Sequence, residues 1–182
     1  LFTQGMVCHQ TYKIDNNWFS PEEVISENGK DFFLKKDPKK KVLVGPSESM
    51  SKSKKNTIDP EIMINNYGAD AVRFFILSDS PPEKDIQWSE QGMVASYKFI
   101  QKFWNLNSQI FKKVSEKKIK KNSINEKINF ELNLFTNEII KKTTFNLENF
   151  NYNVIIANFH EVYNFFNNFL KYENIENKSL EI

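Results

Sequence analysis

The chain has few of the residues on which metal sites and disulfide frameworks depend. Its 182 residues include one cysteine, Cys8, and two histidines, His9 and His160. A single cysteine cannot form an internal disulfide, which favours a reducing compartment such as the cytoplasm. These three side chains also cannot supply the four ligands of a closed structural zinc site, so we predict no protein-bound metal.

Excess charge of one sign and long apolar runs are also missing. The 25 basic residues nearly balance the 23 acidic ones, and the formal net charge is +2. Bulk electrostatics therefore does not indicate nucleic-acid binding, which would have to depend on local patches. No apolar run approaches the roughly 20 residues of a membrane-spanning helix, so we expect no membrane partner. The first residues carry neither an initiator Met nor a signal-peptide pattern, and we expect a longer parent protein.

The composition is typical of a folded protein, and the two parts of the chain differ in their sequence pattern. Hydrophobic residues make up 40% and charged residues 26%, with 17 Phe, which excludes a disordered chain. Most of the prolines and glycines precede residue 80, among short apolar runs and turns, whereas the sequence after residue 90 is helical in pattern. The length suits one or two modest domains. We therefore predict an α/β part followed by an all-α part.

Within the first part, the apolar segment Phe2 to Cys8 is predicted to be a strand or a buried segment. Residues 31–34 and 41–44 are predicted to pair as a hairpin, and the second of these runs is expected to end in a turn at Gly45-Pro46.

Two helices are predicted next. The first begins at Asp59-Pro60 and ends at Gly68, because Asp is a good N-cap and Gly a good C-terminal residue. The second covers about 69–77. It carries Arg73, for which an ion pair with Asp70 or Asp79 is expected.

The second part is predicted to contain three amphipathic helices. The first begins near Ser89, and its apolar stripe consists of Met93, Tyr97, Ile100, Trp104 and Phe111. A lysine-rich connection at 117–122 precedes the second helix, and a turn at 146–151 precedes the third. The third helix carries His160 among apolar neighbours, where core or surface packing is expected rather than catalysis. Short connections favour antiparallel neighbours, so we expect an antiparallel bundle.

The most informative motif is the run Ser49-Met50-Ser51-Lys52-Ser53, followed by Lys54-Lys55-Asn56. It places a lysine among small hydroxyl residues, between a predicted strand and a predicted helix. The ammonium is a compact point charge and the hydroxyls donate hydrogen bonds, which suits the handling of a polyphosphate. Taken alone, such a run is more often a solvated turn. A solvated hairpin is likewise the plainer reading of the lysines at 35–41, although they could contact tRNA phosphates.

The motif resembles the KMSKS signature of class I aminoacyl-tRNA synthetases, with Ser49 at the position of the first lysine. An ordered set of further segments is similar to the leucyl-tRNA synthetase family. These are Thr3-Gln4-Gly5-Met6-Val7, Thr11-Tyr12-Lys13, Trp18 to Val24, Asp59-Pro60, Tyr67 to Arg73, Ser80 to Asp85 and Trp88-Ser89-Glu90. The set extends to about Trp104, and beyond it only the helical sequence pattern matches the family.

The resemblance implies the C-terminal portion of a class I Rossmann-type catalytic domain at residues 1–85. An incomplete, α-helical anticodon-binding bundle would follow at residues 86–182. It also implies leucine, ATP with Mg²⁺ and tRNA-Leu as partners, and a cytoplasmic enzyme. The N-terminal catalytic half with its HIGH signature would lie outside this chain, so we expect the chain to be inactive alone.

The same resemblance assigns roles within the signature. Lys52 matches the second lysine, which contacts ATP in the family, and we expect it to be catalytic. Ser49, Met50, Ser51 and Ser53 would complete the ATP-binding loop. Lys54 and Lys55 are candidates for phosphate or tRNA contacts, and either could replace the missing first lysine.

Two other interpretations stay open. An isoleucyl or valyl synthetase shares the Asp-Pro and Tyr-Gly-Ala-Asp elements. A free-standing, non-catalytic tRNA-binding helical module could have inherited the loop without using it.

Overall fold

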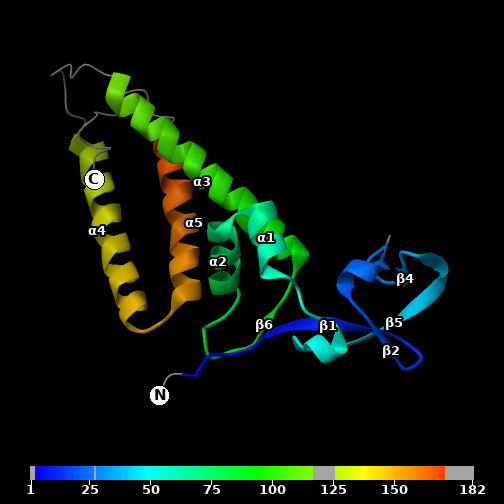
Figure 1. The fold of residues 1–182 in the computed structure, drawn as a ribbon. Helices are drawn as coiled ribbons and strands as arrows, with labels where there is room; N and C mark the ends of the chain where they lie inside the picture. Colours follow the sequence, from blue (N-terminus) through cyan, green and yellow to red (C-terminus); the bar gives the residue numbers. More distant parts are fainter. Residues whose placement is uncertain (1–2, 27, 117–125, 171–182) are drawn as a thin grey trace. The chain divides into compact units, whose positions relative to one another are not determined.

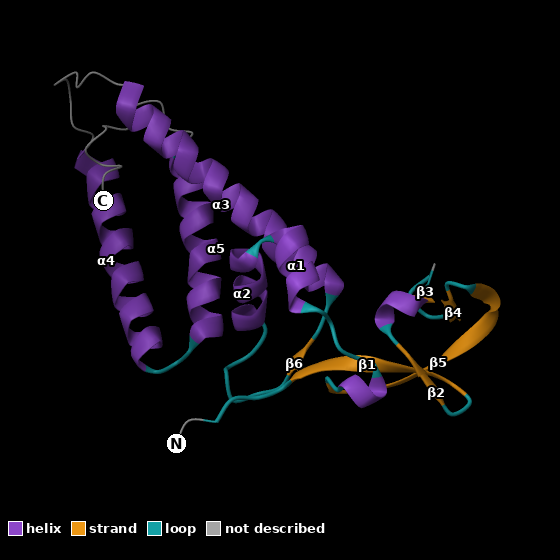
Figure 2. Ribbon diagram, in the orientation of Figure 1, coloured by secondary structure: helices purple, strands orange, loops and turns teal. Residues whose placement is uncertain are grey.

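The structure is a computed structural model of the chain, and it describes residues 3–26, 28–116 and 126–170. The chain divides into two compact units between Val94 and Ala95. Figure 1 shows the elements in sequence order, and Figure 2 distinguishes helices from strands. Each unit is described by itself below.

The first unit is built on a six-stranded sheet. Its strands are β1 (Val7–Ile14), β2 (Asn17–Phe19), β3 (Val24–Ile25), β4 (Phe32–Leu34), β5 (Asp37–Ser49) and β6 (Ile86–Gln87). The order β2-β1-β5-β4-β3 is antiparallel throughout, whereas β6 pairs with β1 in parallel. Since β5 occupies one edge of β1, both β2 and β6 pair with its other edge, one at each end.

The core of this sheet lies on one face. Tyr12, Val24 and Val42 are buried there, and partly buried apolar side chains from β1, β2 and β4 pack against them. Val42 is buried while its neighbour Leu43 is exposed, which is the two-residue alternation of a strand with one solvent-exposed face. The predicted hairpin is confirmed, because β4 pairs with β5.

The expectation of a turn at Gly45-Pro46 is wrong, because β5 continues through both residues to Ser49. The ladder pairs Gln10 with Ser47 and Tyr12 with Val44, so Thr11 on β1 faces two residues on β5. This is a β-bulge, where a proline without its N–H is tolerated. A Cβ on Gly45 would meet the Thr11 hydroxyl, which explains the glycine.

The first strand also begins later than predicted, at Val7 rather than Phe2. The residues just before it bond to the segment at 82–86 instead. Gly5 N donates to Pro82 O at 2.8 Å, and Met6 N donates to the Asp85 carboxylate at 2.8 Å. The sequence pattern identified an extended segment but not where its ladder begins.

Four helical segments complete the first unit before α3. They are the single-turn η1 (Pro21–Glu23) and η2 (Lys52–Lys54), and the helices α1 (Pro60–Tyr67) and α2 (Ala69–Ser78). The two predicted helices are therefore confirmed. Asp59 caps α1 by accepting from Glu61 N at 2.9 Å, and the predicted ion pair joins Arg73 to Asp70 at 3.5 Å.

The second unit contains most of α3 (Glu90–Glu116), together with α4 (Glu126–Glu148) and α5 (Tyr152–Phe169). The three predicted helices are thus present, and the connection at 117–122 lies outside the described residues. α4 and α5 run side by side (Figure 1), with the rings of Phe135 and Phe165 stacked at 3.7 Å. Leu132, at 0% exposure, and Phe169 form the buried centre of this contact.

The apolar stripe predicted for α3 is only partly correct. Met93 is buried as expected, but Trp104 and Phe111 are 72% and 73% exposed. In the second unit the buried apolar side chains of α3 are Phe99 and Leu106. The ring of Phe99 packs 3.9 Å from His160 on α5, so the packing role predicted for His160 is confirmed. None of the helices in the described ranges is long and apolar enough to cross a membrane.

Candidate active-site loop

The lysine-bearing motif begins in the sheet and continues into a tight turn. Ser49 is the last residue of β5 and lies opposite Cys8 of β1. Met50 N donates to Val7 O at 3.1 Å, which extends the ladder by one bond. The chain then turns through η2, and Lys55 ends the turn in the left-handed region, at φ 52°. The signature residues therefore follow directly from the end of a strand.

A buried asparagine ties this turn to the sheet. Asn56 has 0% exposure. Its side-chain oxygen accepts from Ser51 N at 2.8 Å, and its side-chain nitrogen donates to His9 O and Glu48 O, each at 3.2 Å. Sequence reasoning gave Asn56 no role. An uncharged amide between a polar turn and a helix cap was the only available signal.

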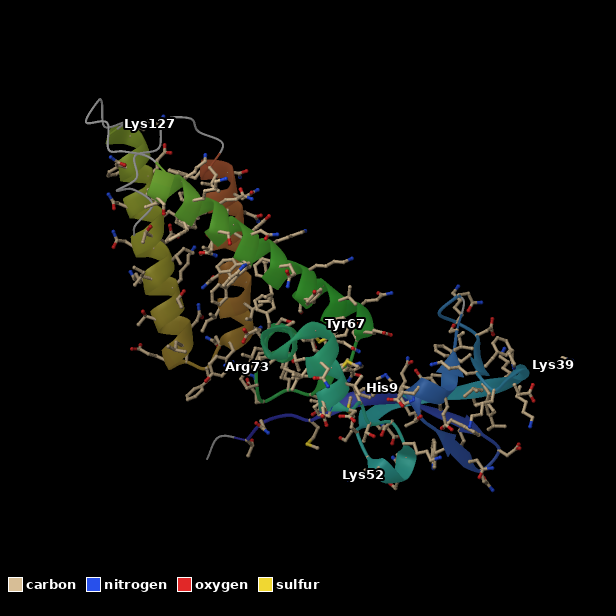
Figure 3. The ribbon with its side chains drawn as sticks, turned by 45° about the horizontal axis from the view of Figure 1, so that its top comes forward. His9, Lys39, Lys52, Tyr67, Arg73 and Lys127 are labelled. Carbon is tan, nitrogen blue, oxygen red and sulfur yellow. The ribbon has the colours of Figure 1, made fainter. Side chains whose placement is uncertain are left out.

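The three lysines of the turn have different surroundings. Lys54 forms an ion pair with Glu48 of β5. Lys55 contributes to lowering the pKa of Glu23, although the larger cause is the hydrogen bond from Ser20 N to that carboxylate. Lys52 is exposed, and its ammonium has no ion-pair partner among the residues that the structure describes (Figure 3). Lys55 is also exposed and forms no ion pair in the described part of the chain, so Lys52 and Lys55 are the two lysines of the turn whose charges are open to a ligand.

The remaining signature residues are polar or partly buried neighbours of Lys52. The hydroxyls of Ser51 and Ser53 lie 2.7 Å apart and form a hydrogen bond. Ser49 is exposed and Met50 is half-buried. The structure therefore places small hydroxyl groups on both sides of the lysine.

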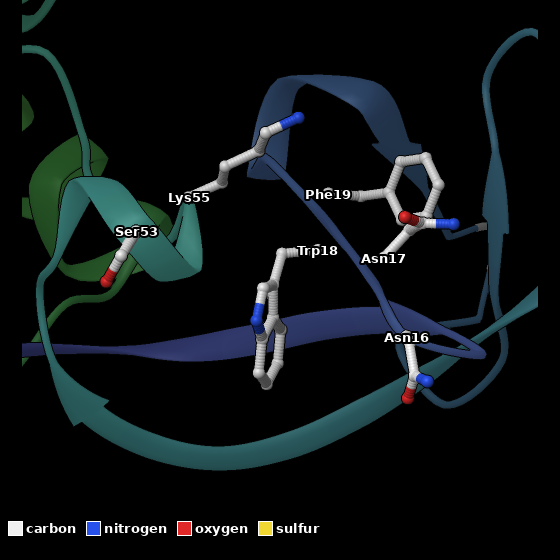
Figure 4. A pocket seen from close by; sticks show the side chains of 6 residues that line it. All are labelled: Asn16, Asn17, Trp18, Phe19, Ser53 and Lys55. Carbon is white, nitrogen blue, oxygen red and sulfur yellow. The ribbon is translucent and has the colours of Figure 1, made fainter.

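A shallow hollow of about 410 Å³ borders the turn. It is lined by Asn16, Asn17, Trp18, Phe19, Ser53 and Lys55 (Figure 4). The ammonium of Lys13 lies 5.0 Å from the centre of the Trp18 ring, a cation–π contact. The hollow belongs to the first unit and connects the turn with β2.

Burial lowers the pKa of His9, which precedes the bulge in β1. The imidazole is therefore neutral at neutral pH, and its Nδ1 is buried without a hydrogen-bond partner in the described part of the chain. Neither His9 nor the nearby Cys8 belongs to a metal site there, since no group of three or more His, Cys, Asp or Glu gathers within the described residues. The groups that the loop can offer to a ligand are therefore the ammonium groups of Lys52 and Lys55, the serine hydroxyls and backbone N–H donors.

Comparison with known proteins is consistent with this geometry. The profile of the family "tRNA synthetases class I (I, L, M and V)" matches residues 18–89, which include the whole turn. The leucine–tRNA ligase of Rickettsia massiliae (strain Mtu5) is 46% identical over 165 residues, covering 90% of this chain and 19% of that protein. The chain belongs to the class I tRNA synthetases.

Within this class, the relatives that match most of the chain are named leucine–tRNA ligases. That of Rickettsia bellii (strain RML369-C) is 44% identical over 177 residues, covering 97% of this chain and 20% of that protein. The chain thus spans about a fifth of the length of these class I relatives.

A solved structure supports the fold. The AgnB2 LeuRS of Agrobacterium radiobacter K84, in a ternary complex with tRNA and LeuAMS, aligns with a TM-score of 0.63 and 24% identity. The alignment covers 73% of this chain and 17% of that one. The mixed sheet and helices of this class I synthetase chain therefore match a LeuRS-like fold.

Proposed function

We propose that this chain is part of an enzyme that ligates leucine to tRNA-Leu, and that its turn at residues 49–55 binds ATP. The observation that carries the proposal is the exposed ammonium of Lys52, which has no ion pair within the described residues, on a turn fixed to the end of β5. The names of the relatives supply the amino acid, leucine.

The reaction class explains why a lysine is needed there. In the first step the leucine carboxylate attacks the α-phosphorus of ATP, and pyrophosphate leaves as leucyl-adenylate forms. Negative charge grows on the departing pyrophosphate, so a fixed cation stabilises the transition state more than the ground state. We assign this role to Lys52, with Mg²⁺ arriving as part of the ATP complex. The leucyl group then passes to the 3′-terminal ribose of the tRNA.

The same proposal gives the two parts of the chain different tasks. Residues 1–85 would form the C-terminal part of a Rossmann-type catalytic domain, and residues 86–182 would belong to an antiparallel bundle that binds tRNA-Leu. The parent enzyme would act in the cytoplasm. Because the signature supplies only one side of the nucleotide site, we expect this chain to be inactive without the rest of the catalytic domain.

The test is leucine-dependent exchange between pyrophosphate and ATP in the full-length ligase that carries these residues. Lys52→Ala should lower the exchange rate by roughly 10²–10³-fold, the usual effect of removing one preorganised stabilising group. Lys39→Ala is the matched control, because Lys39 is an exposed lysine of β5 whose ammonium has no ion pair within the described ranges. Equal rates for the two variants would contradict the proposal.

The amino acid in the same assay separates the alternatives. Exchange stimulated by isoleucine or valine rather than leucine would indicate the related synthetases. Exchange with none of the three would favour a non-catalytic tRNA-binding module.

A further inference from the structure

We propose that Asn56 is a positioning residue for adenylate formation, and that it acts by holding Lys52 against the departing pyrophosphate. The inference rests on the proposed function of Lys52. Asn56 has 0% exposure and its amide bonds to the backbone of Ser51, His9 and Glu48, so we expect any effect on the reaction to pass through the turn.

The geometry shows how one side chain controls the turn. His9 and Glu48 are directly opposite each other in the β1–β5 ladder. The Asn56 amide nitrogen donates to both of their carbonyl oxygens, so it bridges the two strands. Its oxygen accepts from the N–H of Ser51, the residue before Lys52. The amide therefore connects both strands to the start of the turn.

Among the described residues the turn has few other attachments to the sheet. Just before it, Met50 N donates to Val7 O at 3.1 Å. The single turn η2 spans only Lys52–Lys54, and its capping bond from Lys55 N to Lys52 O is long, at 3.3 Å. The hydroxyl bond between Ser51 and Ser53 lies within the turn and does not attach it to the sheet. The Lys54–Glu48 ion pair is partly exposed and is expected to be a weak tether. Asn56 is thus the buried attachment.

A looser turn should affect chemistry more than ground-state binding. The charge on pyrophosphate develops only as the bond to the α-phosphorus breaks, so correct placement of Lys52 matters most in the transition state. A displacement of about 1 Å in such a group can cost on the order of 10²-fold. We therefore expect Asn56→Ala to lower kcat for leucine-dependent pyrophosphate exchange by roughly 10- to 100-fold, with a smaller change in the KM for ATP.

The decisive experiment is a double-mutant cycle in the full-length ligase, with Asn56→Ala, Lys52→Ala and the double variant. If Asn56 acts through Lys52, the double variant should be no slower than Lys52→Ala alone. Asn66→Ala is the matched control, since Asn66 is an exposed asparagine of α1, and it should leave the rate unchanged. Fully additive losses would overturn the proposal, because they would show that Asn56 acts independently of Lys52.

Two further measurements keep the test valid if Asn56→Ala weakens the fold. Asn56→Asp is nearly isosteric and keeps an oxygen for Ser51 N, but it places a second oxygen beside the two carbonyls, so it should also slow exchange. Transfer of leucine to tRNA from preformed leucyl-adenylate releases no pyrophosphate and should be nearly unchanged in both variants. Equal losses in both steps would indicate a general structural role and refute the proposal. If instead Lys52→Ala alone leaves exchange unchanged, the proposed function itself fails.

Discussion

Restoring the missing first lysine of the signature, by Ser49→Lys, should accelerate adenylate formation. Ser49 is exposed at the end of β5, three residues before Lys52, so a longer side chain can be accommodated there. The added ammonium would bring a further positive charge to the start of the turn, at the position of the family's first lysine. Its benefit should appear in the step that releases pyrophosphate.

The size of the gain follows from distance and screening. Three residues span at most about 11 Å between Cα atoms, and a flexible side chain shortens this separation, so we assume roughly 8 Å between the added charge and the pyrophosphate near Lys52. At that distance the attraction between unit charges is about 0.5 kcal/mol in water and about 2 kcal/mol at an effective dielectric constant of 20. These limits correspond to about 2- to 30-fold in rate. Because Ser49 is exposed, we expect the lower part of this range.

Two substitutions at the same position separate charge from size. Ser49→Met introduces a long neutral side chain and should leave the rate of pyrophosphate exchange in the full-length ligase near the original value. Ser49→Glu reverses the charge and should lower it. The gain from Ser49→Lys should also shrink as ionic strength rises, since the charges are exposed. An equal gain from lysine and methionine, or no gain from lysine at any salt concentration, would refute the electrostatic reasoning.

Two further predictions concern the stability of this chain. Leu132→Ala should lower the free energy of unfolding by about 2–5 kcal/mol in urea titrations, because Leu132 has 0% exposure. Leu134→Ala is the control on the same helix and should lower it far less, since Leu134 is 58% exposed. Similar losses in the two variants would contradict the packing of α4 on α5. His160 is exposed, but its packing against Phe99 partly desolvates the ring and lowers its pKa. The unfolded chain therefore takes up a proton below about pH 6.5 before the folded chain does, and stability should fall slightly as pH drops from that value towards the lower, folded pKa. Thermal unfolding of His160→Phe should show a weaker loss across this range.

The helices were the most predictable part of the fold, because their signals are local. Asp59 and Gly68 mark the two ends of α1, and both lie within one turn of the residues they cap. The apolar stripe of α3 was less predictable. Which face is buried depends on the side chains of α5, and those are more than fifty residues away in the sequence.

The sheet was also less predictable, because strand register depends on residues that are distant in the sequence. A Gly-Pro pair normally indicates a turn, and only the register with β1 reveals that Gly45 and Pro46 form a bulge opposite Thr11. In the candidate site, the lysine and hydroxyl residues were recognisable from their type and order. Asn56 was not, because its partners His9 and Glu48 are brought together by strand pairing.

The contacts of the turn bear on the question that the sequence left open, namely whether a neighbouring lysine replaces the missing first lysine. Lys54 is already paired with Glu48, and moving it to a ligand would leave that half-buried carboxylate without its partner. Lys55 follows the turn in a left-handed conformation, borders the hollow beside Trp18 and lies within the electrostatic reach of Glu23. Lys54 therefore has a partner within the first unit, whereas Lys55 is exposed and forms no ion pair among the described residues. Of the two, Lys55 is the one whose charge is available to replace the missing first lysine, and a gain in rate from Ser49→Lys would indicate that it does so only in part.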